Sequence, residues 1–257
     1  MQSLNYLWRV GAAALSYSVF AVGAILMTFI VVVGIGPLPV EIHKKRNWVR
    51  RLIMVAAWLY IRMMRMLGLL TFDLNSIKGL HRPGSLIIAN HLTLIDALFL
   101  MSVSARTCFI VKAALADNPI TSGLIQLAGY IPNCEHGTQL LDHAVDVLQN
   151  NESLVVFPEG TRSAQPGSFK FKRGAANIAL ITNCVIQPIY IECEPLALRK
   201  GEKWYHLPER PSHYKFSTLP LVHVDAHIDL SQPVSLQARV LTRHLQSLYN
   251  CAMQHSP

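Results

Sequence analysis

A histidine and an aspartate five residues apart are the first candidates for chemistry in this chain. His91 and Asp96 stand in the stretch NHLTLID, directly after the apolar run SLIIA (85–89). On a continuous α-helix, residues five apart lie roughly 140° apart around the axis, so these side chains would not meet. If the helix instead begins at Thr93, His91 precedes it in extended backbone and its ring can fold back over the first turn. Asp96 would then hold one ring nitrogen and leave the other free as a general base.

The same stretch also has a purely structural interpretation. Thr93 and Asp96 fit a capping box, with the threonine at the N-cap and the aspartate three residues later. A cap and a His–Asp pair can share one aspartate, so the sequence leaves both roles open.

A second polar cluster, PEGTRS (158–163), follows the apolar run SLVVF (153–157). Its proline and glycine favour a tight turn, and an arginine beside glycine-rich backbone can bind a phosphate bidentately. The cations of FKFKRGAA (169–176) could add to an anion site. The alternatives are a polar surface turn whose Glu–Arg pair contributes under about 1 kcal/mol, and a solvated helix start.

Four motifs, in this order, resemble the signatures of the glycerolipid acyltransferases, the family of the bacterial 1-acylglycerol-3-phosphate acyltransferase. NHLTLID resembles the first signature, N-H-x4-D, and FPEGTRS (157–163) matches the second at every position. FKRGAANIAL (171–180) resembles the third and VIQPIYI (185–191) the fourth, so the resemblance covers roughly residues 76–192. It implies an O-acyltransferase that moves a fatty acyl group from acyl-CoA or acyl-carrier protein to the hydroxyl of a lyso-lipid. It implies no metal and no bound cofactor beyond that co-substrate.

The resemblance also implies the role of each site residue. His91 is the general base that takes the proton of the acceptor hydroxyl, and Asp96 orients and supports it. Arg162 meets the phosphate of the acceptor, and Lys172 assists. The acceptor site as a whole is expected to comprise Glu159, Gly160, Thr161, Arg162 and Lys172.

One segment departs from the family pattern. A Gly-φ-φ-x-x-Arg motif usually helps to bind glycerol phosphate, but GYIPNCEHG (129–137) contains no arginine. Lys112 could still supply charge. The acceptor is therefore open between a lysophospholipid such as 1-acylglycerol-3-phosphate and a lyso-lipid with another head group, such as a lyso-ornithine lipid. A non-catalytic lipid-binding protein on the same fold is the third alternative.

The elements that must position these residues alternate along the chain. SLIIA, SLVVF and VIQPIYI are predicted strands, and helices are predicted over 94–103, 138–149 and about 175–182. This alternation predicts an α/β domain with a largely buried sheet, and the resemblance implies a mixed sheet flanked by helices. Functional residues in such domains gather at the carboxyl ends of strands, so two adjacent strands would unite the two polar clusters.

The segment LVHVDAHIDL (221–230) alternates strictly between apolar and polar residues and predicts a late strand. We expect its polar side to be a solvated strand face, because a flat row of side chains does not close a tetrahedral metal site. That row consists of His223, Asp225, His227 and Asp229.

The N-terminal part is predicted to bind the membrane. Val10 to Val40 contains no Asp, Glu, Lys or Arg, whereas a spanning helix needs about 20 apolar residues, so a retained anchor is favoured over a signal peptide. A second apolar helix is predicted over 48–70, with Arg51, Arg62 and Arg65 on one narrow face. We expect this helix to lie at the membrane interface, the alternative being a helix packed on the core. The predicted domains are 1–75, membrane anchor and interfacial helix, and 76–257, the catalytic domain.

Composition supports this division. The chain has 257 residues, 51% hydrophobic and only 15% charged, and a net charge of +8. Its basic residues flank apolar segments, which favours membrane lipids over nucleic acid as partners. Lys44, Lys45 and Arg46 follow the anchor, which predicts an inner-membrane protein with its catalytic domain on the cytoplasmic side. The five cysteines contain no C-x-x-C pair and are expected to be reduced thiols.

Overall fold

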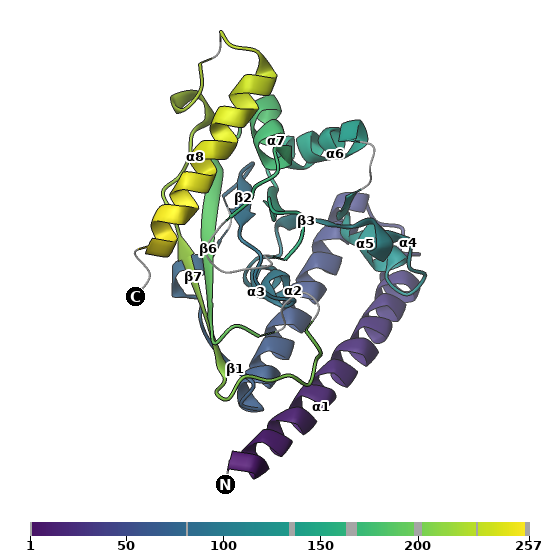
Figure 1. Ribbon diagram of the computed structural model, residues 1–257. Helices are drawn as coiled ribbons and strands as arrows, with labels where there is room; N and C mark the ends of the chain where they lie inside the picture. The colour runs from purple at the N-terminus through teal and green to yellow at the C-terminus, as the bar shows by residue number, and fades with distance from the viewer. Residues whose placement is uncertain are drawn as a thin grey trace.

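The computed structural model is built around a seven-stranded sheet with the strand order β1-β7-β6-β2-β5-β3-β4 (Figure 1). It describes residues 2–80, 82–133, 137–162, 169–197, 202–229 and 231–254. The strands are β1 (Leu70–Asp73), β2 (Leu86–Ala89), β3 (Thr107–Lys112), β4 (Ile131–Asn133), β5 (Ser153–Val156), β6 (Ile186–Glu194) and β7 (Ser212–Thr218).

Helices cover both faces of this sheet. The helices α6, α7 and α8 pack on one face, and α2 and α3 pack on the other, with α1 lying outside α2 (Figure 1). Their bounds are α1 (Gln2–Phe29), continued by a π-helical segment η1 (Ile30–Ile35), α2 (Ile42–Met66), α3 (Asp96–Val103), α4 (Ala113–Asp117), α5 (Ser122–Ala128), α6 (Gly137–Gln149), α7 (Gly174–Thr182) and α8 (Val234–Gln254). Two short 3-10 turns are η2 (Asn75–Ile77) and η3 (Val224–Ala226).

The central strand β2 shows why its sequence is a continuous apolar run. Leu86 and Ile88 face the core under α6, α7 and α8, whereas Ile87 and Ala89 face the core under α2 and α3. A strand buried on both faces needs apolar side chains at every position. The parallel neighbours of β2 are β5 and β6, so the predicted mixed α/β sheet is confirmed and the carboxyl ends of β2 and β5 meet at one edge.

The sheet begins before residue 76, where we predicted that the catalytic domain starts. The edge strand β1 precedes that boundary and pairs in parallel with β7, from Leu70 opposite Ser212 to Asp73 opposite Lys215. The residues directly after α2 therefore belong to the sheet.

The late strand predicted over 221–230 is wrong. Val222 makes an isolated bridge with Ile186, and the chain then forms η3 over Val224–Ala226. The strand β6 begins at Ile186, so the chain beyond Val222 has no neighbour with which to form a ladder. Val222 and Val224 are buried in the core, which accounts for the apolar half of the alternating pattern.

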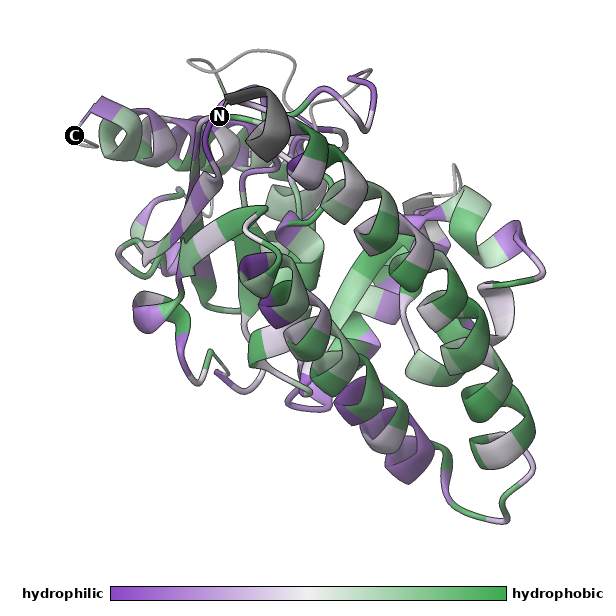
Figure 2. Ribbon diagram, turned by 90° about the horizontal axis from the view of Figure 1, so that it is seen from below, coloured by the Kyte–Doolittle hydropathy of each residue, from purple (hydrophilic) through white to green (hydrophobic). Residues whose placement is uncertain are grey.

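The N-terminal helices dock on the domain along one side and remain exposed along the other. In α1, the indole of Trp8 donates to the carbonyl of Leu67 (3.3 Å), and Arg9 donates to the carbonyl of Pro208 (2.6 Å). The segment Tyr6–Ile35 is the one helix in the described chain that is long and apolar enough to cross a membrane. Figure 2 shows this helix as mostly apolar, starting from the N-terminus.

The helix α2 combines the two alternatives considered for it. Val49, Ala57 and Ile61 are buried against the domain, as expected for a helix packed on the core. Trp58 and Leu59 are exposed on the outer side, as expected for an interfacial helix.

Candidate active site

His91 and Asp96 meet at the carboxyl edge of β2. The Nδ1 of His91 lies 3.1 Å from Oδ2 of Asp96, within hydrogen-bond distance. Asp96 is fully buried, whereas the imidazole is partly exposed. A carboxylate only accepts, so in a neutral imidazole this bond assigns the proton to Nδ1 and leaves Nε2 as the acceptor nitrogen. His91 lies ahead of α3 and Asp96 in its first turn, as the spacing of five required.

The aspartate also shapes the loop between the strand and the helix. Its Oδ2 accepts the backbone N–H groups of Leu92 and Thr93 (both 2.7 Å), and its Oδ1 accepts the hydroxyl of Thr93 (2.5 Å). The helix begins at Asp96 and not directly after Thr93, so the predicted N-cap is wrong. The hydroxyl of Thr93 instead donates to the carboxylate of Asp96, and the N-cap position falls on Ile95, whose side chain has no group to cap the helix.

Glu159 connects the second cluster to the first. Its Oε1 accepts the backbone N–H of His91 (2.9 Å), and the residue is 8% exposed. The ring of Phe157 stacks on the imidazole of His91, with centroids 4.4 Å apart and planes at 28°. Since β2 and β5 are adjacent and parallel, the two predicted clusters come together, and His91 is held at its ring, its backbone and its face.

The turn after β5 requires a glycine. The backbone N–H of Gly160 donates to the carbonyl of Phe157 (3.0 Å), and Gly160 has φ of +70°. A Cβ at this position would lie 3.0 Å from Nζ of Lys172, while the backbone N–H of Lys172 donates to the carbonyl of Pro158 (2.8 Å). The third signature therefore packs against the second, and the ammonium group of Lys172 lies directly over the turn.

Thr161 and Arg162 continue from this turn. Thr161 is exposed and Arg162 is half-buried. Ser163 of the predicted cluster lies outside the described residues. Lys112 is exposed at the carboxyl end of β3, on the edge of the sheet that also carries His91.

Several residues that build the site were not singled out from the sequence. Asn90 is fully buried and clamps β6, since its Nδ2 donates to the carbonyl of Ile191 (2.8 Å) and its Oδ1 accepts the N–H of Ile191 (2.7 Å). Burial raises the pKa of Tyr214 well above its usual value, so this phenol remains neutral beside Asp96. The sequence shows only that an asparagine stands directly before His91. Its position does not reveal that its side chain bonds to β6.

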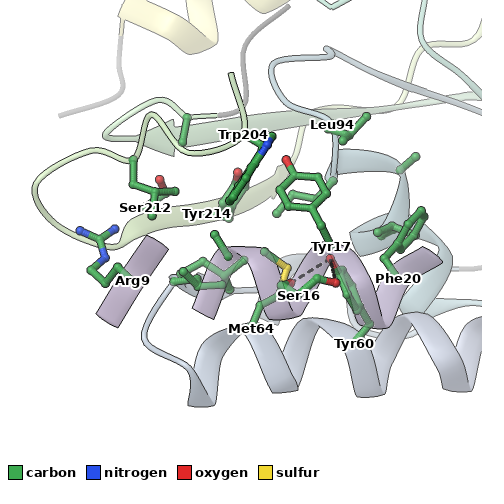
Figure 3. Close-up of a pocket in the computed structure, with 18 of the residues that line it drawn as sticks. Arg9, Ser16, Tyr17, Phe20, Tyr60, Met64, Leu94, Trp204, Ser212 and Tyr214 are labelled. Carbon is green, nitrogen blue, oxygen red and sulfur yellow. Dashed lines mark hydrogen bonds between the residues drawn. The ribbon is translucent and has the colours of Figure 1, made fainter. Parts of the chain in front are cut away.

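An apolar pocket of about 270 Å³ opens beside the His–Asp pair. Leu94 and Ile95, which immediately precede Asp96, line it together with side chains of α1, α2 and the segment before β7. In Figure 3, Tyr17 of α1 and Trp204 point toward one another at its wall, with their ring centroids 6.1 Å apart. The pocket is therefore closed in part by the N-terminal helix, and its size and lining suit a hydrocarbon chain.

No metal site accompanies these residues in the described parts of the chain, where no group of three or more His, Cys, Asp or Glu side chains could hold an ion. The polar row predicted over 223–229 does not lie on a strand, because its segment contains the turn η3. Its His227 stacks on His244 of α8 (centroids 3.9 Å). Cys108, Cys184, Cys193 and Cys251 are free thiols, and Cys134 lies outside the described residues.

The segment over 129–133, where the usual arginine of the family is missing, forms the end of α5 and the edge strand β4. Gly129 has φ of +65° at the end of α5. Pro132 and Asn133 in β4 pair with Val111 and Lys112 of β3. The described part of this segment therefore supplies no cation of its own, but Arg50 of α2 donates to the carbonyl of Gly129 (3.4 Å) and Lys112 pairs with Asn133 in register.

Comparison with known proteins gives a consistent result. The model of the Acyltransferase family matches residues 73–192. A 1-acyl-sn-glycerol-3-phosphate acyltransferase of Limnanthes alba is 33% identical over 144 residues, which are 54% of this chain and 50% of the plant protein. The protein of the same name from Helicobacter pylori is 30% identical over 125 residues, which are 46% of this chain and 53% of that protein. The chain thus spans about half the length of these curated relatives.

The fold has a solved counterpart. The crystal structure of the 1-acyl-sn-glycerophosphate (LPA) acyltransferase PlsC from Thermotoga maritima superposes with a TM-score of 0.74 at 18% identity. The match covers 99% of this chain and 97% of the other, so the shared fold includes the N-terminal helices as well as the sheet.

Proposed function

We propose that this chain, whose residues 73–192 match the Acyltransferase family and resemble 1-acyl-sn-glycerol-3-phosphate acyltransferases, is a glycerolipid acyltransferase that transfers a fatty acyl group from an acyl thioester to the hydroxyl of a lyso-lipid. The single observation that carries the proposal is the His91–Asp96 hydrogen bond, with the second ring nitrogen unprotonated beside a cationic turn. The acyl donor is acyl-CoA or acyl-carrier protein.

In the proposed mechanism, His91 acts as a general base and not as a nucleophile. Its Nε2 takes the proton of the acceptor hydroxyl while the hydroxyl oxygen attacks the thioester carbonyl. The carbon–sulfur bond then breaks, and the thiolate leaves as free thiol by taking the proton back from Nε2 of the imidazolium. The buried carboxylate of Asp96 stabilises the imidazolium formed in between, because opposite charges attract strongly in a site shielded from water.

The acceptor is bound at the turn after β5. Arg162 and Lys172 provide positive charge there, Glu159 holds the backbone of His91, and Gly160 allows the turn. A guanidinium and an ammonium group favour a phosphate-bearing head group, and the relatives are named for 1-acylglycerol-3-phosphate. We therefore propose 1-acylglycerol-3-phosphate as the acceptor. Comparison of its turnover with that of lyso-ornithine lipid tests this choice against the alternative raised by the missing arginine.

An acyl chain is proposed to occupy the apolar pocket beside the pair. Leu94 and Ile95 connect the pocket directly to Asp96, so a chain lying there places its carboxyl end near His91. Removing methylene groups from water contributes about 0.8 kcal/mol each, which gives such a pocket substantial affinity for a lipid tail.

Membrane binding is proposed to occur through the outer sides of α1 and α2. Leu7, Leu26 and Phe29 of α1 are exposed, as are Trp58 and Leu59 of α2. Large exposed apolar surfaces mark sites of contact with partners or membranes. We place these helices at the inner membrane, with the catalytic domain on its cytoplasmic side, because the basic residues that follow the apolar segment favour the anionic lipids of the cytoplasmic leaflet.

The experiment that tests the function uses purified protein in detergent with 1-acylglycerol-3-phosphate and acyl-CoA or acyl-carrier protein, and follows the release of free thiol. We expect His91→Ala to lower kcat by about 10²–10⁴-fold, the usual contribution of a positioned base. His143→Ala, at an exposed histidine of α6, is the matched control and should retain the wild-type rate.

Thermal unfolding of both variants distinguishes lost chemistry from lost structure. A folded His91→Ala protein with the wild-type rate would refute the mechanism. A wild-type protein that releases no thiol with any lyso-lipid would instead support the non-catalytic alternative.

A further inference from the structure

A second pocket, which we call the polar pocket, lies on the opposite side of the domain from the acyl-transfer site. It has a volume of about 450 Å³ and lies between the last turns of α2, the end of α3 and the segment that joins β1 to η2. Its ionisable lining residues are Arg62, Arg65, Asp73 and Lys78. Three positive charges and one negative charge give it a net positive charge, so it favours an anion.

The two arginines are held by aromatic rings and not by acids. The guanidinium of Arg62 lies over the ring of Trp58 (4.1 Å from Cζ to the centroid), and that of Arg65 lies over Phe72 (5.3 Å). In the described residues neither arginine takes part in an ion pair. Stacking holds a guanidinium by its face and leaves its N–H edge free, and that edge is the part that binds a phosphate bidentately.

The acid and the lysine of the pocket are already engaged locally. Oδ1 of Asp73 accepts the backbone N–H of Asn75 (2.9 Å), and Nζ of Lys78 donates to Oδ1 of Asn75 (2.6 Å). Asp73 therefore fixes the turn after β1. Lys78 has two further donors available, since an ammonium group carries three.

The polar pocket is distant from the His–Asp pair. The strand β1 is parallel to β7, β7 is antiparallel to β6, and β6 is parallel to β2. The end of β1 thus lies at the edge opposite the end of β2. Ser102 and Val103 of the pocket also lie at the far end of α3 from Asp96, about 10 Å along the helix axis.

The polar pocket opens beside the apolar side of α2. At about 100° per residue, Trp48, Val55, Leu59, Arg62 and Met66 fall on one side of the helix, and all of them are exposed. The arginine therefore shares a side with residues that the proposed function places in the membrane. Arginines at such a position extend toward the phosphate level of the bilayer.

We propose that the polar pocket binds the phosphate of an anionic membrane phospholipid, separately from the substrates of acyl transfer. The phosphate lies between the guanidinium edges of Arg62 and Arg65 and within reach of Lys78. The acyl chains of this lipid run along the exposed apolar side of α2. The inference rests on the membrane location of α2 given under the proposed function.

The test measures the binding of soluble dihexanoyl phosphatidylglycerol to the full-length protein in a non-ionic detergent, by isothermal titration calorimetry. We expect saturable binding that Arg62→Gln and Arg65→Gln each weaken at least tenfold. Arg51→Gln removes the same charge from the same helix outside the polar pocket and should change the affinity less than about fivefold, the general effect of one basic residue near an anionic surface. Dihexanoyl phosphatidylcholine, which has no net charge, should bind at least tenfold more weakly.

Three outcomes would overturn the proposal. Equal weakening by Arg51→Gln and Arg62→Gln would indicate general attraction to the lipid. Binding that is lost in Arg162→Ala and kept in Arg62→Gln would place the lipid in the acyl-transfer site. Inorganic phosphate that binds as tightly as the lipid, with the same dependence on Arg62, would identify a free anion as the ligand.

The binding measurement requires no turnover, so the two proposals can fail separately. His91→Ala protein should bind dihexanoyl phosphatidylglycerol like the wild type. Normal lipid binding without thiol release would count against the acyltransferase alone, and normal thiol release without lipid binding would count against the polar pocket alone.

Discussion

At the scale of single residues, the most connected group of the candidate site is the carboxylate of Asp96. It accepts bonds from the ring of His91, from two backbone N–H groups and from the hydroxyl of Thr93. A buried carboxylate is stable only when such donors surround it. The same carboxylate therefore fixes the loop and holds the ring of His91, although the helix is not capped by Thr93 as the sequence suggested.

Glu159 provides a prediction at this scale. Its Oε1 accepts the backbone N–H of His91, and glutamine offers a carbonyl oxygen of the same shape. Glu159→Gln should retain kcat within about tenfold, whereas Glu159→Ala should lose about 10²-fold, because misplacement by about 1 Å is enough for such a loss. Steady-state kinetics at saturating acceptor measure both.

One further measurement completes the Glu159 test. Melting temperatures show whether either variant is unfolded, and Glu152→Ala is an unsuitable control because Glu152 pairs with the buried Arg50. If glutamine reduced kcat as strongly as alanine, the charge of Glu159 and not its hydrogen bond would be required.

At the scale of elements, α8 holds together the two strands next to the candidate site. The hydroxyl of Tyr249 donates to the carbonyl of Ile88 in β2 (2.8 Å) and accepts the N–H of Ile189 in β6 (3.2 Å). Tyr249 is fully buried, and burial raises the pKa of its phenol well above the usual value, so it stays a neutral donor. The C-terminal helix thereby supports the strand β2, which ends two residues before His91.

We expect Tyr249→Phe to lower the free energy of unfolding by about 1–3 kcal/mol, because it leaves a buried carbonyl and a buried N–H without their partner. Tyr6→Phe is the control, since the hydroxyl of Tyr6 donates to the carbonyl of Tyr205 at an exposed site, and exposed changes usually stay within about 0.5 kcal/mol. Thermal unfolding in detergent measures both. Equal melting temperatures for the two variants would show that the bridge between β2 and β6 contributes no stability.

At the scale of the whole molecule, α1 is attached to the domain over nearly its full length. Tyr6 and Arg9 bond to the carbonyls of Tyr205 and Pro208 near its start, and Val32 in η1 packs closely against Gly123 of α5. A helix that crossed the bilayer upright would draw this attached domain into the hydrocarbon, where its polar surface is costly. We therefore expect α1 to lie along one membrane surface with α2.

Topology mapping tests this orientation. An epitope tag before Met1 and another inserted after Pro39 should both be accessible from the same side of sealed membrane vesicles. A tag after the last residue reports the side of the catalytic domain and serves as the reference. If the first two tags were accessible from opposite sides of the vesicles, α1 would span the membrane.

The sequence determined the parts of this protein that depend on local pattern. Continuous apolar runs predicted β2, β5 and β6, and their order with the helices predicted the α/β sheet. The signatures indicated an acyltransferase and predicted the residues of the candidate site, because catalysis and phosphate binding restrict residue types within short segments. The strands β1, β3, β4 and β7 were not predicted; of these, β1 and β4 are the edge strands of the sheet, and edge strands are often very short.

Only the tertiary structure decided how the pieces meet. The pairing of β2 with β5 brought Glu159 to the backbone of His91. The start of β6 at Ile186 left the segment 223–229 without a strand partner. The polar pocket joins the last turns of α2 to the end of β1. Each of these depends on contacts between residues far apart in the chain, which local periodicity cannot encode because it describes a segment without its neighbours.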